Sequence, residues 1–193
     1  DAAEDNEATA RAINAEGAGA LASLCAAMDM PLIHISTDMV FDSAAPETPL
    51  TEEITPHPGS KYGATKLDGE VLVRAAGGRS VIVRVSRLFG DDATSFVSKM
   101  ISLARNRDTL SIVTDEAGRP TPFDNLAAHL VRLAGVMTRA APVPPLLHFT
   151  YFAASPLFSC ISWSLLCSLH FVVSKIRRAV AEYPNLLHGV KPT

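Results

Sequence analysis

Cysteine is scarce in this sequence. Only three of its 193 residues are cysteines, Cys25, Cys160 and Cys167, and none of them forms a C-x-x-C pair. An odd number without that spacing argues against a disulfide framework and against a zinc site, so no metal is expected. The same scarcity indicates reduced thiols and therefore a cytoplasmic protein.

Charge is also low and nearly balanced. Charged residues make up 19% of the chain, the formal net charge is −3 and the isoelectric point is about 6.1. Without a basic stripe, a nucleic-acid partner is not expected. The acidic start, Asp1 to Asp5, lacks the basic residues of a secretory signal peptide. The length suits one domain with a sizeable core, or one domain with an appendage.

One stretch lacks charge entirely. Residues 149–173 contain no Asp, Glu, Lys or Arg, and Lys175, Arg177 and Arg178 follow. The stretch could be a membrane anchor, although its many serines and one proline weaken that interpretation, or it could be a buried helix pair. We favour a third interpretation, in which it is a divergent hydrophobic tail joined by an alternative or erroneous gene model. The expected division is thus a domain at 1–150 and a tail at 151–193.

Helical and strand-like patterns alternate over the first 150 residues. Helices are expected at 6–28, 61–76, 94–105 and 123–137, and apolar or β-branched strands at 32–35, 80–85, 110–113 and 146–149. The loop 42–59 holds four prolines and cannot be regular for long. This alternation predicts an α/β fold with a parallel sheet covered by helices.

Apolar spacing predicts which helical residues are buried. In the first helix, Ile13, Leu21 and Leu24 are expected on one buried face. In the helix at 94–105, the inward residues are expected to be Phe96, Val97, Met100 and Leu103.

A Y-x-x-x-K pair is the most informative local feature. Tyr62 and Lys66 are four residues apart in a predicted helix, so they share one face. A phenol ordinarily titrates at about pH 10, and a neighbouring ammonium is expected to lower its pKa toward the range of a general acid. Thr37 lies at the carboxyl end of the preceding strand, the edge at which open α/β sheets bind ligands. Its hydroxyl could bind the substrate carbonyl oxygen to which Tyr62 would deliver a proton. The alternative is an exposed helical pair without function.

Six stretches resemble the extended short-chain dehydrogenase/reductases, and most closely the dTDP-4-dehydrorhamnose reductase family. They are Asp1–Glu4, Ile13–Gly17, His34–Asp42, Tyr62–Glu70, Arg84–Gly90 and Gly118–Thr121. The resemblance implies a Rossmann-like sheet with part of a small substrate domain. It also implies cytoplasmic NAD(P)H-dependent reduction of a 4-keto nucleotide sugar in dTDP-rhamnose biosynthesis.

The resemblance also assigns roles to particular residues. Tyr62 would protonate the keto oxygen, Lys66 would lower the pKa of that phenol and hold the nicotinamide ribose, and Thr37 would polarise the carbonyl. The expected cofactor-binding residues are therefore Tyr62 and Lys66. The expected substrate-binding residues are Asp38, Met39, Arg87, Arg119 and Thr121. Met39 and Arg87 replace residues that are usually aromatic in the family, so the sugar is not predicted.

The pyrophosphate-binding segment of the family is not found in this chain. Gly17-Ala18-Gly19-Ala20-Leu21-Ala22 fits G-x-G-x-x-A by letter, but helix-forming residues precede it where a strand is required. We interpret these glycines as close-packing positions within a helix. The fold is therefore expected to be truncated at its N-terminus and this chain alone to be inactive, and NADPH cannot be told from NADH as the cofactor.

An alternative function belongs to a different class. The same residues could persist as scaffold in a non-catalytic subunit similar to the regulatory β subunit of methionine adenosyltransferase, whose partner would be that enzyme's catalytic subunit. A homo-oligomer is also compatible with the sequence. A membrane-tethered form would depend on residues 149–173.

Overall fold

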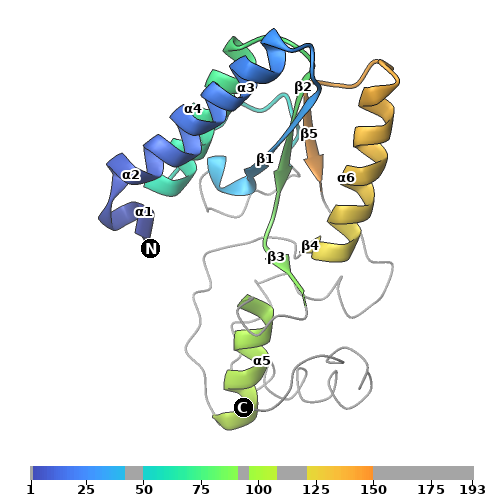
Figure 1. Cartoon of the computed structure of the whole chain (residues 1–193). Helices are drawn as coiled ribbons and strands as arrows, with labels where there is room; N and C mark the ends of the chain where they lie inside the picture. The colour runs from blue at the N-terminus through green and yellow to red at the C-terminus, as the bar shows by residue number, and fades with distance from the viewer. Residues whose placement is uncertain (1, 42–49, 91–95, 108–120, 150–193) are drawn as a thin grey trace. The chain divides into compact units, whose positions relative to one another are not determined.

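The computed structural model describes residues 2–41, 50–90, 96–107 and 121–149 (Figure 1). The chain forms two compact units, one of residues 1–86 with 126–149 and the other of residues 87–125 with 150–193. The predicted strand at 110–113 and the predicted tail at 151–193 lie outside the described residues. The division at residue 150 therefore stays a prediction.

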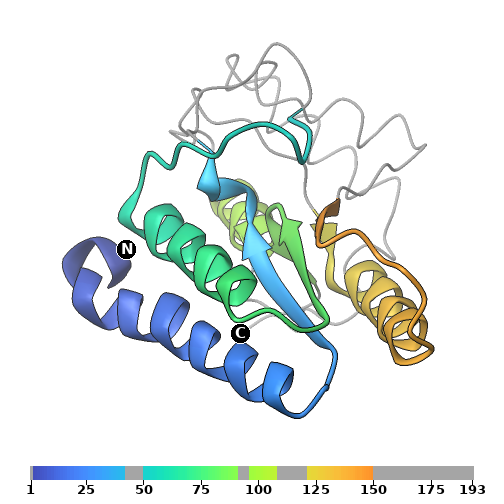
Figure 2. The ribbon, with the colours of Figure 1, turned by 90° about the horizontal axis from the view of Figure 1, so that it is seen from above.

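The first unit contains a parallel three-stranded sheet in the order β1-β2-β5. Its strands are β1 (Leu32–Thr37), β2 (Ser80–Val85) and β5 (Leu146–Phe149). In the register, Ile33 lies opposite Val81, and Val83 lies opposite Leu147. Figure 2 shows α3 (Ala18–Ala27) and α4 (Lys61–Ala75) on one side of the sheet and α6 (Phe123–Thr138) on the other. The predicted α/β architecture is confirmed.

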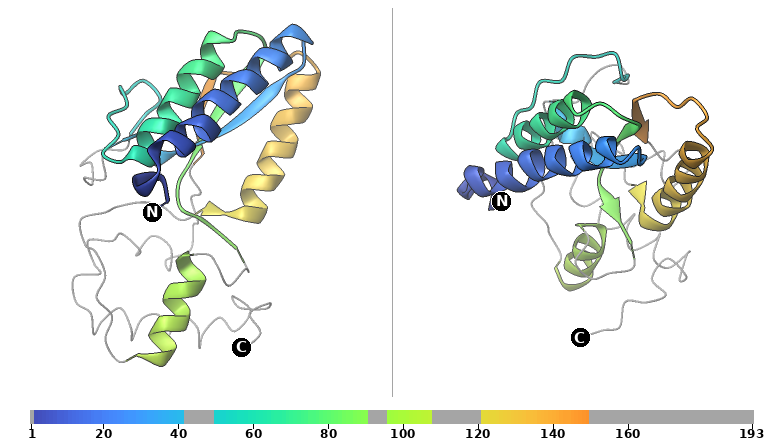
Figure 3. Two further views of the ribbon diagram at one scale, coloured as in Figure 1. Left: turned by 60° about the vertical axis from the view of Figure 1, so that its left-hand side comes forward. Right: turned by 45° about the horizontal axis from the view of Figure 1, so that its top comes forward.

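The N-terminal helix is divided into several elements. It comprises α1 (Ala2–Asp5), α2 (Glu7–Arg11), a π-helical stretch η1 (Ala12–Gly17) and α3. Asn6 caps α2, because its side chain accepts a hydrogen bond from the backbone N–H of Thr9 at 3.1 Å. Helices α2 and α3 run beside α4 (Figure 3). The prediction of helix at 6–28 is confirmed, but the π-helical stretch was not predicted.

Local signals set the ends of α4. The Ser60 side chain accepts a hydrogen bond from the backbone N–H of Gly63 at 3.0 Å and so caps the first turn. After the helix, Gly77 and Gly78 both adopt a φ of +72°, a conformation that glycine takes without steric cost. The chain then enters β2.

The core of this unit joins helix and sheet. Ala22, Val73, Ile82 and Leu146 form it, and Ala18, Leu32 and Ala76 pack against it. A Cβ added at Gly19 would lie 2.8 Å from the Cβ of Leu72 on α4. The interpretation of Gly19 as a close-packing position is therefore confirmed.

The predicted buried face of the first helix is wrong. Ile13, Leu21 and Leu24 are 68%, 52% and 62% exposed, whereas Ala15 and Ala22 are 1% and 0% exposed. The reason is the close approach of this helix to α4, which only small side chains permit. The larger apolar residues consequently lie on the outer face.

The second unit is described in part. Its short strands β3 (Leu88–Phe89) and β4 (Thr121–Pro122) pair in parallel, and α5 spans Phe96–Asn106. Leu103, predicted to face inward, is 36% exposed, whereas the neighbouring Ala104 is 1% exposed. Leu103 is therefore less buried than predicted, Met100 is partly buried, and the side chains of Phe96 and Val97 lie outside the described residues. Two-residue strands such as β3 and β4 are too short for a sequence pattern to indicate.

The described helices include none that is both long enough and apolar enough to cross a bilayer. The candidate anchor at 149–173 lies, apart from Phe149, outside the residues that the structure describes.

Candidate active site

Thr37, Tyr62 and Lys66 meet at the carboxyl end of β1. Thr37 is the last residue of that strand and is buried, and Tyr62 and Lys66 lie in the first two turns of α4. The Tyr62 and Thr37 side chains form a hydrogen bond. The Nζ of Lys66 donates to the backbone carbonyl of Ile35 at 2.7 Å. The structure therefore pairs Tyr62 with Thr37 and places the Lys66 ammonium on the same strand, at the carbonyl two residues before Thr37.

The pKa of Tyr62 is shifted in the opposite direction from the prediction. Its pKa is raised above 10.0, mainly because the phenol is partly buried and also because Asp38 is close, while the hydrogen bond with Thr37 lowers the pKa. The prediction that Lys66 would lower the pKa of Tyr62 is wrong for this structure. The Lys66 ammonium is bonded to the Ile35 carbonyl, and desolvation of the phenol dominates.

Lys66 lies in a partly buried environment with two neighbouring ionisable groups. Burial lowers the pKa of Lys66, whereas the carboxylate of Glu70, one turn along α4, raises it. On β1, burial and then the charge of Lys66 lower the pKa of His34 to about 4, so this histidine is neutral at pH 7. The Nε2 of His34 is buried without a hydrogen-bond partner in the described part of the chain.

A short 3-10 helix, η2 (Asp38–Val40), continues directly from β1. The Thr37 hydroxyl donates a hydrogen bond to the Asp38 Oδ1, and the Thr37 Oγ1 accepts one from the Met39 backbone N–H, each at 3.2 Å. Gly63 lets α4 begin against this turn, because an added Cβ there would collide with the Met39 carbonyl oxygen. Asp38 and Met39 thus lie beside the Thr37–Tyr62 pair. Their predicted contact with a substrate stays a prediction.

The remaining predicted substrate residues belong to the second unit. Arg87 has a φ of +40°, which is uncommon for a residue with a side chain, and its carbonyl accepts from the Thr121 backbone N–H at 3.1 Å. Thr121 is fully buried, with an exposure of 0%. Arg119 lies outside the described residues. Arg87 and Thr121 are therefore adjacent, and their roles stay predictions.

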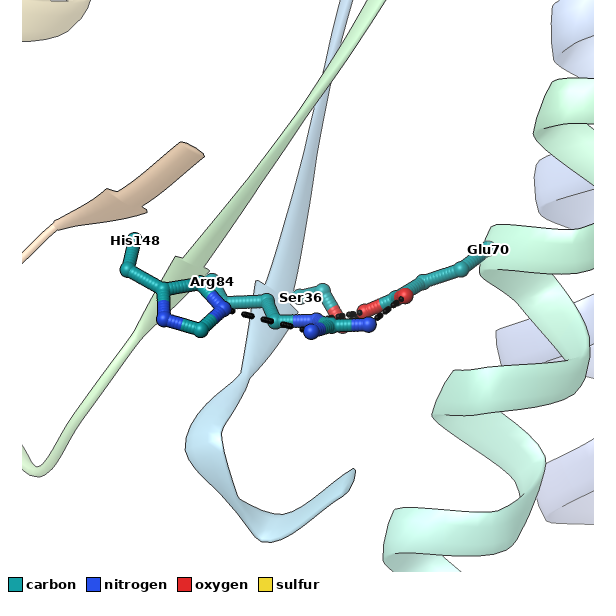
Figure 4. Close-up of polar contacts among 4 residues, drawn as sticks. All are labelled: Ser36, Glu70, Arg84 and His148. Atoms are coloured by element: carbon teal, nitrogen blue, oxygen red, sulfur yellow. Dashed lines mark hydrogen bonds and ion pairs between the residues drawn. The ribbon is translucent and has the colours of Figure 1, made fainter. Parts of the chain in front are cut away.

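A buried charge network was not identified from the sequence (Figure 4). The Glu70 carboxylate accepts three hydrogen bonds, from Ser36 Oγ at 2.6 Å, from Arg84 Nε at 2.8 Å and from Arg84 Nη2 at 2.6 Å. Glu70 and Arg84 are 1% and 4% exposed. The signal was available, because Arg84 interrupts a β-branched strand and Glu70 follows Lys66 at helical spacing.

The network continues to β5 through His148. The Arg84 Nη1 donates to His148 Nε2 at 3.2 Å, since a guanidinium has only donors, and His148 Nδ1 donates to the Leu50 carbonyl at 3.1 Å. These two contacts require the neutral imidazole protonated on Nδ1. The backbone N–H of His148 donates to Glu52 Oε1 at 2.7 Å, and this bond is the main cause that lowers the pKa of Glu52.

A cavity of about 310 Å³ adjoins this network. Glu52, Glu70 and Arg84 contribute to its walls, together with neighbouring residues of the loop 52–56 and of α4. Thr37, Tyr62 and Lys66 are not among the residues that line it. The cavity is therefore distinct from the space beside the three predicted catalytic side chains.

Comparison with known proteins decides the family. The model of the RmlD substrate binding domain matches residues 1–160. The chain belongs to this family. The matched region of the RmlD domain passes residue 150, where the resemblance was expected to end, and it includes Thr37, Tyr62 and Lys66.

Relatives of this RmlD chain are named as reductases. The dTDP-4-dehydrorhamnose reductase of Sinorhizobium fredii is 40% identical over 134 residues, which are 69% of this chain and 45% of the relative. The enzyme of the same name from Aggregatibacter actinomycetemcomitans is 32% identical over 183 residues, covering 94% of this chain and 58% of the relative. The chain thus spans about half the length of these relatives.

Solved structures of the RmlD family agree with the fold. The dTDP-4-dehydrorhamnose reductase of Bacillus anthracis, in complex with NADP, gives a TM-score of 0.72 at 30% identity, covering 99% of this chain and 61% of that structure. The reductase ortholog from Clostridium acetobutylicum gives 0.70 at 33% identity, covering 88% and 59%. The predicted family and fold are confirmed. Nothing in these matches supports the regulatory-subunit alternative.

Proposed function

We propose that this chain carries the proton-transfer centre of an NAD(P)H-dependent reductase that acts on a 4-keto nucleotide sugar, dTDP-4-dehydrorhamnose in the first instance. The observation that carries the proposal is the hydrogen bond between Tyr62 and Thr37 at the carboxyl end of β1, with Lys66 anchored on Ile35 beside it. Membership of the RmlD family and similarity to named reductases support the same conclusion.

The residues at this edge fit a nicotinamide dinucleotide. Open α/β sheets bind nucleotides at the carboxyl ends of their strands. There the Lys66 ammonium and the Tyr62 hydroxyl provide two polar groups from consecutive turns of α4, both partly buried. The ammonium suits ribose hydroxyls, which accept hydrogen bonds. The bound cofactor, NADPH or NADH, supplies the hydride; the Bacillus anthracis relative was solved with NADP.

Tyr62 gives its proton to the keto oxygen of the sugar. A general acid must hold a proton before the reaction, and the raised pKa of Tyr62 ensures that the phenol is neutral at pH 7. Thr37 orients this hydroxyl through their shared hydrogen bond and can bind the same carbonyl oxygen. Lys66 holds the ribose and supplies positive charge near the oxygen on which negative charge develops.

The substrate residues in this proposal are Asp38, Met39, Arg87, Arg119 and Thr121. Asp38 and Met39 follow Thr37 directly in η2 and would contact the sugar. An arginine suits a diphosphate because its planar guanidinium can donate two parallel hydrogen bonds. Arg87 and Arg119 would therefore contact the nucleotide diphosphate.

The test uses the full-length protein and one conservative variant. Oxidation of NADPH and of NADH is followed with and without dTDP-4-dehydrorhamnose. We expect oxidation that depends on the sugar nucleotide, and a loss of about 10²-fold or more in kcat for Tyr62→Phe, which removes the hydroxyl that donates the proton and keeps the ring. Undiminished turnover by Tyr62→Phe would refute the role of Tyr62.

A further inference from the structure

Glu70 is held from two strands of the sheet at once. Its carboxylate accepts a hydrogen bond from Ser36 on β1 and a bidentate pair from Arg84 on β2. Arg84 is in turn fixed by His148 on β5, and its guanidinium lies 5.2 Å from the centre of the Phe41 ring. Figure 4 shows the four polar side chains in a row from the sheet to α4. The position of the Glu70 carboxylate is therefore strongly constrained.

The Glu70 carboxylate stabilises the charged form of Lys66. Glu70 lies four residues after Lys66, hence on the same face of α4 one turn away. Burial of Lys66 disfavours its charged form, and Glu70 opposes that effect. Ser36 connects Glu70 to the strand whose Ile35 carbonyl binds the Lys66 ammonium. One strand end thus holds both the lysine and the group that stabilises its charge.

The other ionisable groups described near Lys66 do not supply the negative charge that Glu70 provides. His34 on β1 is neutral at pH 7, Tyr62 on α4 keeps its proton, and Asp38 in η2 acts on Tyr62. Arg84 on β2 is paired with Glu70 itself. Two exposed ion pairs join α4 to the helix before it, Arg11–Asp68 and Lys61–Glu7.

We propose that Glu70 is a positioning residue for the reduction, fixed by the two hydrogen bonds from Arg84 so that its carboxylate stabilises the Lys66 ammonium one helical turn away, at the strand end that carries Thr37. This inference rests on the proposed reductase function. The buried Glu70–Arg84 ion pair would then serve the reaction as well as stability, because it helps to keep Lys66 protonated.

The experiment compares two variants of the full-length protein. Glu70→Gln removes the charge with little change in size, whereas Ser36→Ala removes a hydrogen bond to the same carboxylate and leaves the charge. For Glu70→Gln we expect kcat to fall by about tenfold to a hundredfold with KM for the sugar nucleotide nearly unchanged. We also expect the alkaline limb of its pH–activity profile, where activity falls as the pH rises, to lie at lower pH than in the wild type. Ser36→Ala should keep the wild-type alkaline limb.

A second readout does not depend on turnover. Lysines labelled with ¹³C at the ε carbon are titrated by NMR, and the Lys66 signal is identified by its absence in Lys66→Arg. In Glu70→Gln this signal should titrate at lower pH than in the wild type, and in Ser36→Ala at the wild-type pH. If Glu70→Gln does not fold, Glu70→Gln/Arg84→Met replaces it, because removing both members of a buried pair avoids an unpaired charge.

The outcomes separate the two proposals. A wild type that reduces the sugar nucleotide, together with a folded Glu70→Gln whose kcat, alkaline limb and Lys66 titration match the wild type, would overturn the positioning role alone. A full-length wild type without reductase activity would overturn the proposed function, and the catalytic part of this inference with it. Reduced thermal stability of Glu70→Gln without any change in the pH profile would show a purely structural pair.

Discussion

Thr37 and Tyr62 depend on one another at the scale of single residues. Burial and the charge of Asp38 raise the pKa of Tyr62, and the hydrogen bond with Thr37 lowers it. Thr37 also accepts from the Met39 backbone N–H, so it stabilises the turn that follows β1. One hydroxyl therefore contributes both to local structure and to the acidity of the proton donor.

We expect Thr37→Val to reduce kcat by about 10²-fold, because both the orientation of Tyr62 and a hydrogen bond to the substrate oxygen are lost. The pKa of Tyr62 should rise further, since a bond that lowers it is removed. Steady-state kinetics and ultraviolet titration of the tyrosines measure the two effects. Thr37→Ser, which keeps the hydroxyl, should retain most activity; equal losses in both variants would contradict this account.

At the scale of elements, the packing of α4 against the preceding helix depends on missing side chains. A Cβ added at Gly69 would collide with the backbone carbonyl of Asn14 in η1, whereas a Cβ at Gly135 in α6 would meet only the end of the Arg139 side chain, at 4.0 Å. Glycine in a helix costs about 1 kcal/mol relative to alanine. Its presence at position 69 is therefore explained by the close helix contact.

Two glycine-to-alanine variants test this explanation. Gly69→Ala should lower the free energy of unfolding by about 1–3 kcal/mol, because overpacking against backbone outweighs the gain in helix propensity. Gly135→Ala is the control and should raise the free energy of unfolding by about 0.5–1 kcal/mol. Urea denaturation followed by circular dichroism measures both. Stabilisation by Gly69→Ala would show that the two helices can separate.

At the scale of the whole molecule, stability should depend on pH through His34. Its pKa in the folded protein is about 4, compared with 6.5 in the unfolded chain. The unfolded state therefore binds more protons between these values, and the free energy of unfolding falls as the pH is lowered from 6.5 toward 4. Because the imidazole is incompletely buried, we expect a loss of about 1–2 kcal/mol.

Urea denaturation between pH 7 and pH 4.5 measures this loss. His34→Gln, which cannot titrate, should show a flatter dependence on pH than the wild type over that range. His57→Gln is the matched control, since His57 is exposed in the loop before α4. Parallel pH curves for the wild type and His34→Gln would exclude His34 as the source.

Local patterns predicted most of the elements because short-range interactions determine them. The β-branched run at 80–85 became β2, Ser60 capped α4, and Gly77 and Gly78 ended it. The same patterns failed for Ile13, Leu21 and Leu24, since which face of a helix is buried depends on its neighbour. They also did not indicate the π-helical stretch at Ala12–Gly17.

The sequence by itself determined the family, the order of strands and helices, and the placement of Tyr62 and Lys66 on one helix face after the strand that ends at Thr37. The elements and the Tyr62–Lys66 spacing follow from residues close together in the chain, and the family follows from six short stretches between Asp1 and Thr121. Only the tertiary structure decided that burial raises the pKa of Tyr62, that Lys66 binds the Ile35 carbonyl, and that Glu70 and Arg84 pair in the interior. Desolvation and buried ion pairs arise between segments distant in sequence, so no local pattern specifies them.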